Sequence, residues 1–66
     1  MRLTINGETR EVPPVRTLSE LIAALSLDTR KVAIEQNLEI VPRSLHAKTA
    51  VAEGDRIEIV HFIGGG

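Results

Sequence analysis

The sequence contains no cysteine, tryptophan or tyrosine, and its only aromatic side chain is Phe62. The absence of cysteine excludes a disulfide scaffold, a zinc–thiolate site and a cysteine nucleophile. Small secreted domains usually depend on disulfides, so we expect an intracellular, cytoplasmic protein. With a single phenylalanine available, the hydrophobic core must be built from aliphatic side chains.

Long apolar runs and an excess of one charge are also missing. No segment approaches the roughly 20 apolar residues of a membrane span, and the first residues lack the apolar stretch of a signal peptide. A formal net charge of −1 argues against a nucleic-acid-binding surface. The 66 residues, 42% of them hydrophobic, predict one small soluble domain that binds neither nucleic acid nor membrane.

The first third of the sequence predicts a β-hairpin and then a helix. Side chains alternate between apolar and polar over residues 1–6, as in a half-buried strand, and Asn6-Gly7 is a strong hairpin-turn signal. The return strand over residues 10–12 should end at the two prolines that follow it. The helix should then present one apolar stripe to the core, formed by Leu18, Leu21, Ile22 and Leu25.

The start of this helix fits a capping box. Thr17 can accept a hydrogen bond from the backbone N–H of Glu20, and the Glu20 side chain can bond back to Thr17. Such a reciprocal pair marks the first turn of a helix, so we expect the helix to begin directly after Thr17.

The second half predicts another hairpin and a final strand. Strands are expected at residues 32–36 and 39–41, followed by an irregular segment over residues 43–50. Val51 should fill the core just before a turn, and the last strand should cover residues 56–62.

The predicted order is strand, strand, helix, strand, short strand, strand. A sheet with one helix across a single face is the α+β arrangement that suits this order, and the order is that of the β-grasp, or ubiquitin-like, fold. We therefore predict a mixed sheet of four to five strands with one main helix in residues 1–62, and a flexible glycine tail over residues 63–66.

Few side chains are suited to catalysis. His46 and His61 have no acidic residues beside them at metal-ligand spacing, and both are interpreted as surface residues. None of the serines lies in a G-x-S-x-G pattern. The sequence thus predicts neither a catalytic nor a metal site, and a protein that is not an enzyme.

The end of the sequence is more informative than its side chains. Gly64, Gly65 and Gly66 lack a Cβ, so this run can pass through a narrow channel in a partner and leaves the last carbonyl open to attack. The alternative is an inert, mobile end. We favour a functional tail because the glycines close the sequence and follow the apolar pair Phe62-Ile63.

Strand alternation also predicts a partner-binding surface. If Ile57 and Ile59 face the helix, the residues between and after them face the open side of the sheet. Val60 and Phe62 would then form an exposed apolar patch shortly before the glycines, and such a patch suits a protein partner. The predicted partner-binding surface consists of Glu58, Val60, Phe62 and Ile63. The alternative is that Phe62 folds over the sheet edge.

Three segments carry a resemblance to a known family: residues 3–8 (Leu-Thr-Ile-Asn-Gly-Glu), residues 39–44 (Glu-Ile-Val-Pro-Arg-Ser) and residues 54–66 with the final glycines. Over essentially its whole length the chain resembles the ThiS family, the sulfur-carrier proteins of thiamine (thiazole) biosynthesis. A terminal Gly-Gly is common to ubiquitin-like carriers, whereas the Ile-Val-Pro-Arg-Ser run joined to this length and ending is more specific.

The resemblance implies a carrier that binds no cofactor itself. An E1-like adenylyltransferase would use ATP to adenylate Gly66, and a persulfide sulfur, supplied indirectly by a cysteine desulfurase, would displace AMP and leave a thiocarboxylate. Thiazole synthase would take that sulfur for the thiazole ring. Gly64 and Gly65 would form the slender stem that enters both partners' active sites.

The sequence departs from the family at the second hairpin, where Asn37-Leu38 stands in place of the usual Asn-Gly. Leucine at positive φ is unfavourable, so we expect a longer turn or one of another type. Other functions stay open: the small subunit of molybdopterin synthase, a β-grasp binding module, or conjugation to lysines. The shorter chain and the segment at residues 41–44 count against the first of these.

Overall fold

A computed structural model describes residues 1–62 of the chain. Ile63 and the predicted glycine tail lie outside the described residues. The elements follow the predicted order: β1 (Arg2–Ile5), β2 (Glu8–Glu11), α1 (Leu18–Ala24), β3 (Val32–Gln36), β4 (Glu39–Val41) and β5 (Arg56–His61), with short 3₁₀ turns at Thr29–Lys31 and Arg43–Leu45.

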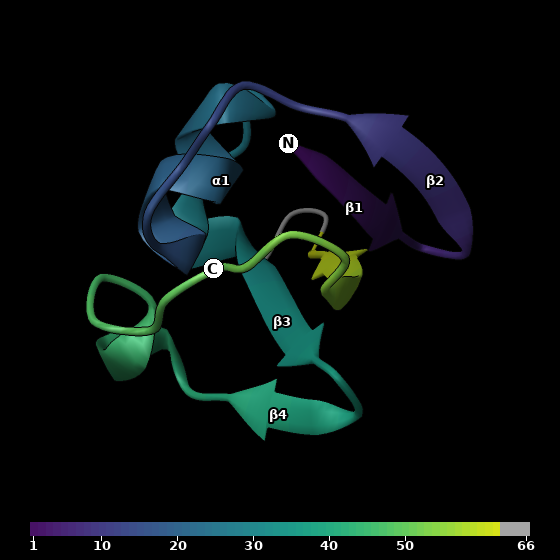
Figure 1. Cartoon of the computed structure of the whole chain (residues 1–66). Helices are drawn as coiled ribbons and strands as arrows, with labels where there is room; N and C mark the ends of the chain where they lie inside the picture. The colour runs from purple at the N-terminus through teal and green to yellow at the C-terminus, as the bar shows by residue number, and fades with distance from the viewer. Residues whose placement is uncertain (63–66) are drawn as a thin grey trace.

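The strands form one mixed sheet in the order β2-β1-β5-β3-β4. Strands β1 and β5 are parallel, and the other pairs are antiparallel. Figure 1 shows α1 beside the sheet and the two hairpins β1–β2 and β3–β4 on either side of β5. This five-stranded sheet with one helix is the predicted β-grasp fold, and β5 is its central strand.

The core is entirely aliphatic, as the composition requires. It joins one face of the sheet to α1, and Val51 enters it from the loop before β5, as predicted. Leu25 of the predicted helix stripe is only partly buried, because α1 ends at Ala24. The ten buried residues are Leu3, Ile5, Val12, Leu18, Leu21, Ile22, Val32, Ile34, Val51 and Ile57.

One half of the predicted capping box is present. The Thr17 hydroxyl accepts from the Glu20 backbone N–H at 3.3 Å, which fixes the start of α1. The return bond to Thr17 was wrongly predicted: the Glu20 carboxylate accepts from the backbone N–H of Arg16 at 2.7 Å. The Glu20 side chain therefore binds the backbone N–H of Arg16, the residue before the N-cap, which has no hydrogen-bond acceptor within the helix.

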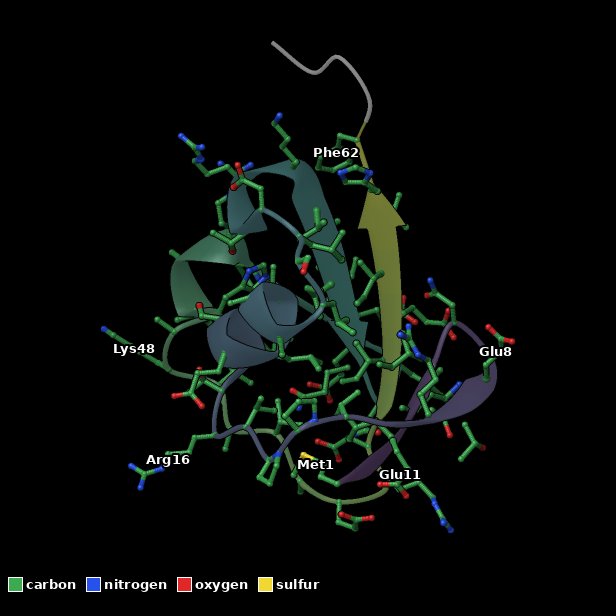
Figure 2. All side chains as sticks on the ribbon, turned by 90° about the horizontal axis from the view of Figure 1, so that it is seen from above. Met1, Glu8, Glu11, Arg16, Lys48 and Phe62 are labelled. Atoms are coloured by element: carbon green, nitrogen blue, oxygen red, sulfur yellow. The ribbon has the colours of Figure 1, made fainter. Side chains whose placement is uncertain are left out.

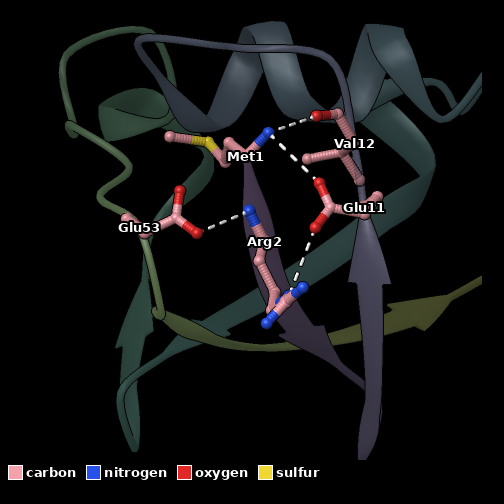
Figure 3. Close-up of polar contacts among 5 residues, drawn as sticks. All are labelled: Met1, Arg2, Glu11, Val12 and Glu53. Carbon is pink, nitrogen blue, oxygen red and sulfur yellow. Dashed lines mark hydrogen bonds and ion pairs between the residues drawn. The ribbon is translucent and has the colours of Figure 1, made fainter.

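The start of β1 is tied to two neighbouring segments (Figure 3). The Met1 ammonium donates to the Val12 carbonyl at 2.8 Å and lies 3.6 Å from the Glu11 carboxylate. The Arg2 guanidinium also bonds Glu11, at 3.2 Å, and the Arg2 backbone N–H donates to Glu53 at 2.9 Å. These contacts hold β1 between β2 and the loop that leads into β5.

The turn between β3 and β4 differs from the one expected. It is neither longer nor of another type: Asn37 and Leu38 have φ values of 50° and 73°, and Asn6 and Gly7 in the first hairpin have 51° and 83°. Both hairpins therefore use a two-residue turn with positive φ at both positions. Leu38 adopts a left-handed conformation, and 72% of its surface is exposed.

We expect Leu38→Gly to stabilise the protein by about 0.5–1 kcal/mol. Removing the left-handed strain of an L-residue gains about 1–2 kcal/mol, and the greater chain entropy of glycine takes back about 0.5–1 kcal/mol. Urea unfolding measures the difference. Gly7→Leu is the matched control, because a Cβ at this position meets nothing within 4 Å and only the backbone strain changes. Gly7→Leu should therefore lower the stability by about as much as Leu38→Gly raises it. An unchanged or lower stability of Leu38→Gly would contradict the strain.

Candidate functional site

Strand β5 presents its side chains alternately to the core and to the open face of the sheet. Ile57 is completely buried and Ile59 packs partly buried against the core, while Glu58 is half-buried and Val60 is 59% exposed. The predicted alternation is thus confirmed. It leaves Val60 as an exposed apolar residue two positions before Phe62.

Two asparagines in the hairpin turns hold β5 from either side. The Asn6 side chain accepts from the Ile59 backbone N–H at 2.7 Å and donates to the Ile59 carbonyl at 3.2 Å. The Asn37 side chain accepts from the Arg56 N–H at 2.9 Å. Sequence reasoning interpreted both asparagines only as turn formers. Their second role depends on β5 lying between the hairpins, which the turn motifs do not encode.

Asp55, directly before β5, connects three segments through its carboxylate. It accepts from the Ala52 backbone N–H at 2.8 Å, from the Gln36 amide at 3.0 Å and from the Asn37 amide at 3.1 Å. Burial by itself favours the neutral carboxyl, but these hydrogen bonds outweigh it, so the pKa of Asp55 lies below its ordinary value of 3.8. Asp55 therefore works as an ionised junction at the start of β5.

The open face of β3, β4 and β5 carries exposed apolar side chains. Ala33 lies opposite Val60 in the register, and Ile40 of β4 is 78% exposed. An open hollow of about 190 Å³ lies here, lined by Ala33, Ile34, Glu35, Ile40, Glu58 and Val60. Sequence reasoning missed Ile40, since alternation over a three-residue strand does not say which face is buried.

Two carboxylates border this hollow. Glu35 of β3 lies directly opposite Glu58 of β5 in the strand register. Glu58 also forms an ion pair with Arg56, whose Nε lies 3.7 Å from the carboxylate. The open face therefore combines apolar residues with a cross-strand pair of like charges, an arrangement that destabilises a sheet.

Phe62 follows the last residue of β5 and is 44% exposed. Its backbone N–H donates to the Lys31 carbonyl at 2.7 Å, which continues the pairing of β5 with β3 by one residue. Figure 2 places Phe62 at the opposite end of the molecule from Met1 and Glu11. It does not line the hollow, while Ile63, Gly64, Gly65 and Gly66 lie outside the described residues.

The interpretation of His46 as a surface residue was wrong, whereas His61 is exposed as predicted. His46 is only 1% exposed. Its Nε2 lies 3.1 Å from the Val41 carbonyl, and its Nδ1 lies 3.0 Å from the Thr29 hydroxyl. A carbonyl can only accept, so Nε2 carries the proton of that bond. The ring joins the end of β4 to the turn before β3, because the loop after β4 folds back against α1.

Among residues 1–62, no group of three or more histidine, aspartate or glutamate side chains is placed to hold a metal ion. The described part of the chain also contains no helix long and apolar enough to cross a membrane.

The five-stranded mixed sheet with one helix over its inner face places the chain in the ubiquitin-like β-grasp class. The profile of the ThiS family matches residues 3–66. The chain belongs to the ThiS family.

Solved structures and known sequences agree with this assignment. A crystal structure of the thiamine biosynthesis protein ThiS from Geobacter metallireducens is 35% identical in sequence and superposes with a TM-score of 0.82, with both chains fully covered. The sulfur carrier protein ThiS of Bacillus subtilis is 38% identical over 50 residues, which are 76% of each chain.

Longer relatives are also similar. A thiazole synthase from Paramagnetospirillum magneticum is 54% identical over all 66 residues, and one from Magnetococcus marinus is 39% identical. The chain spans about one fifth of the length of these two relatives.

Proposed function

We propose that the chain is a sulfur carrier of thiamine biosynthesis and that Gly66 carries the sulfur as a thiocarboxylate. The observation that carries this proposal is the match to the ThiS family over residues 3–66, which includes the three final glycines. The chain is a co-substrate in this proposal, not an enzyme, and none of its side chains takes part in bond formation.

The chemistry starts at the Gly66 carboxylate, which is a poor electrophile. An E1-like adenylyltransferase joins it to the α-phosphate of ATP and releases pyrophosphate, so AMP becomes the leaving group. The terminal sulfur of a persulfide, replenished by a cysteine desulfurase, attacks the acyl carbon and expels AMP. A second thiol then attacks the remaining S–S bond, forms a disulfide with the other sulfur and releases the thiocarboxylate.

We propose thiazole synthase as the acceptor of this sulfur. The proposal is supported by two relatives that bear this name and match the full length of the chain. Gly64 and Gly65 serve as a stem without side chains that lets Gly66 enter a partner's active site. ATP belongs to the adenylating partner, and the chain itself holds no cofactor.

The proposed contact surface is the end of β5 and the residues after it: Glu58, Val60, Phe62 and Ile63. Its described part fits the role, since Val60 and Phe62 are exposed apolar side chains that precede the tail in the sequence.

The proposal is tested by mass spectrometry of the intact chain after incubation with a purified E1-like adenylyltransferase, ATP and a persulfide donor. We expect one oxygen to be replaced by sulfur, and fragmentation to place the change at Gly66. Fragmentation is needed because oxidation of Met1 adds nearly the same mass. The enzyme should be one that charges a related carrier. If Gly66 then stays a plain carboxylate and no adenylate forms, the result would favour a β-grasp binding module.

Phe62→Asp should weaken binding to the adenylating enzyme about tenfold or more while leaving stability nearly unchanged. The side chain lies outside the buried core, and hot-spot aromatics at an interface contribute about 2 kcal/mol or more. Isothermal titration calorimetry measures the affinity, and urea unfolding measures the stability. A large loss of stability would instead show that Phe62 supports the fold.

A further inference from the structure

The open face of β3 and β5 carries a cross-strand pair of like charges, an arrangement that costs stability. Glu35 and Glu58 are direct cross-strand neighbours, so their Cβ atoms are about 4.5–5.5 Å apart. Arg56 approaches Glu58 along β5, whereas Glu35 lies across from it on β3. Among the ion pairs of residues 1–62, one involves Glu58 and none involves Glu35.

The surroundings of the two carboxylates are apolar. Ala33 and Val60 form the neighbouring cross-strand pair, and Ile40 lies opposite Glu35 on β4. Together they line an open hollow of about 190 Å³ whose sides include both glutamates. The β1–β2 half of the same face differs, because Arg2 is paired there with Glu11.

We propose that this face, the Glu35–Glu58 hollow, binds a partner protein that presents an arginine next to an apolar side chain. The inference rests on the carrier function proposed above and specifies the chemistry of the partner. The guanidinium lies between the Glu35 and Glu58 carboxylates, and the apolar side chain enters the hollow beside Ile40 and Val60.

Arginine fits this place better than lysine does. Its planar guanidinium has five N–H donors in a fixed fork and can donate to both carboxylates at once, whereas an ammonium is a compact point charge. The aliphatic part of the arginine side chain can also cover Val60 or Ile40. Arginine is enriched at protein interfaces and among the residues that contribute most to binding.

A second copy of the chain is the less suitable occupant. A two-fold interface through this face would bring the same residues of both copies together. The carboxylates of Glu35 and Glu58 would then meet their own equivalents, and four like charges would be desolvated together. The charge of the hollow therefore favours a different, basic partner.

The test compares Glu35→Gln/Glu58→Gln with the unaltered chain, using a purified E1-like adenylyltransferase as the probe. We expect the double variant to bind at least about tenfold more weakly, with a smaller dependence of its affinity on salt. We also expect it to be more resistant to urea, since the repulsion between like charges is gone. Glu39→Gln, an exposed change on β4, is the matched control and should alter neither quantity.

Opposite shifts in affinity and stability separate a binding role from a structural one. Unchanged affinity in the double variant, or a loss of both affinity and stability, would overturn the proposal. The proposal would also be overturned if sedimentation equilibrium showed that the unaltered chain forms a dimer and that Val60→Asp dissociates it. The yield of thiocarboxylate at saturating enzyme is measured separately and tests the carrier function. If the double variant still forms thiocarboxylate and binds the enzyme as tightly as the unaltered chain, the proposal for the hollow fails and the carrier function stands.

Discussion

One additional alanine after Gly66 is expected to lower thiocarboxylate formation by at least about a hundredfold. Each residue extends a chain by up to about 3.5 Å, so the carboxylate moves away from its place in the adenylating site and acquires a neighbouring Cβ. A displacement of about 1 Å at a reacting group can already cost a hundredfold in rate. Mass spectrometry of the reaction products, followed over time, measures the rate.

The control for this variant is the removal of the same alanine. Treatment with a carboxypeptidase that stops at glycine restores Gly66 as the last residue, and the rate should return. Urea unfolding of the extended chain should match that of the unaltered chain, since the core lies within residues 3–57. An extended chain that is charged at the normal rate would argue against Gly66 as the reacting residue.

Asp55→Ala is expected to lower the free energy of unfolding by about 2–3 kcal/mol, because hydrogen bonds to a charged group contribute about 1.5–3 kcal/mol. The change removes the acceptor of three donors, on Ala52, Gln36 and Asn37. In a domain of this size each kcal/mol shifts the melting temperature by about 4–8 °C, so calorimetry resolves the effect.

The same substitution should alter the dependence of stability on pH. The pKa of Asp55 is lower in the folded state than its ordinary value of 3.8, so the folded protein binds fewer protons at this site. Its stabilising contribution is complete above pH 3.8 and is lost as the pH falls through the lower, folded pKa. Asp55→Ala should therefore lose less stability than the unaltered chain when acidified through this range.

Asp28→Ala is the matched control for acidification. Hydrogen bonds from the side chain and from the backbone N–H of Arg30 lower the pKa of Asp28 to about 2. The ion pair with the Arg30 side chain lies at the surface, where such pairs contribute little. We expect Asp28→Ala to lower the melting temperature at neutral pH less than Asp55→Ala does, because it removes one backbone cap and one exposed ion pair. An equal loss of melting temperature in both variants would show that Asp55 stabilises the fold no more than Asp28 does.

The elements that the sequence predicted correctly are those encoded by local patterns. Alternation over residues 1–6 and over β5 identified two strands, and the stripe beginning at Leu18 identified the helix and its buried face. The exposure of Val60 followed from that same alternation. The final glycines and the resemblance to the ThiS family carried the proposed function, and neither needed a structure.

Other features depend on which segments become neighbours. The burial of His46 results from the loop after β4 folding back against α1, and sequence spacing does not report that contact. Leu38 adopts a positive φ because the pairing of β3 with β4 and the bonds of Asn37 to the start of β5 hold the turn to two residues. Tertiary contacts here outweigh a local preference.

The sequence by itself determined the strands, the helix, the aliphatic core and the family, because each depends on neighbouring residues or on the order of residues along the chain. Only the tertiary structure decided that β5 lies between β1 and β3. That placement brings Glu35 opposite Glu58 and lets Ile40 and Val60 line one hollow from the two sides of β3. Contacts between strands far apart in sequence are set by packing of the whole sheet, so no local pattern contains them.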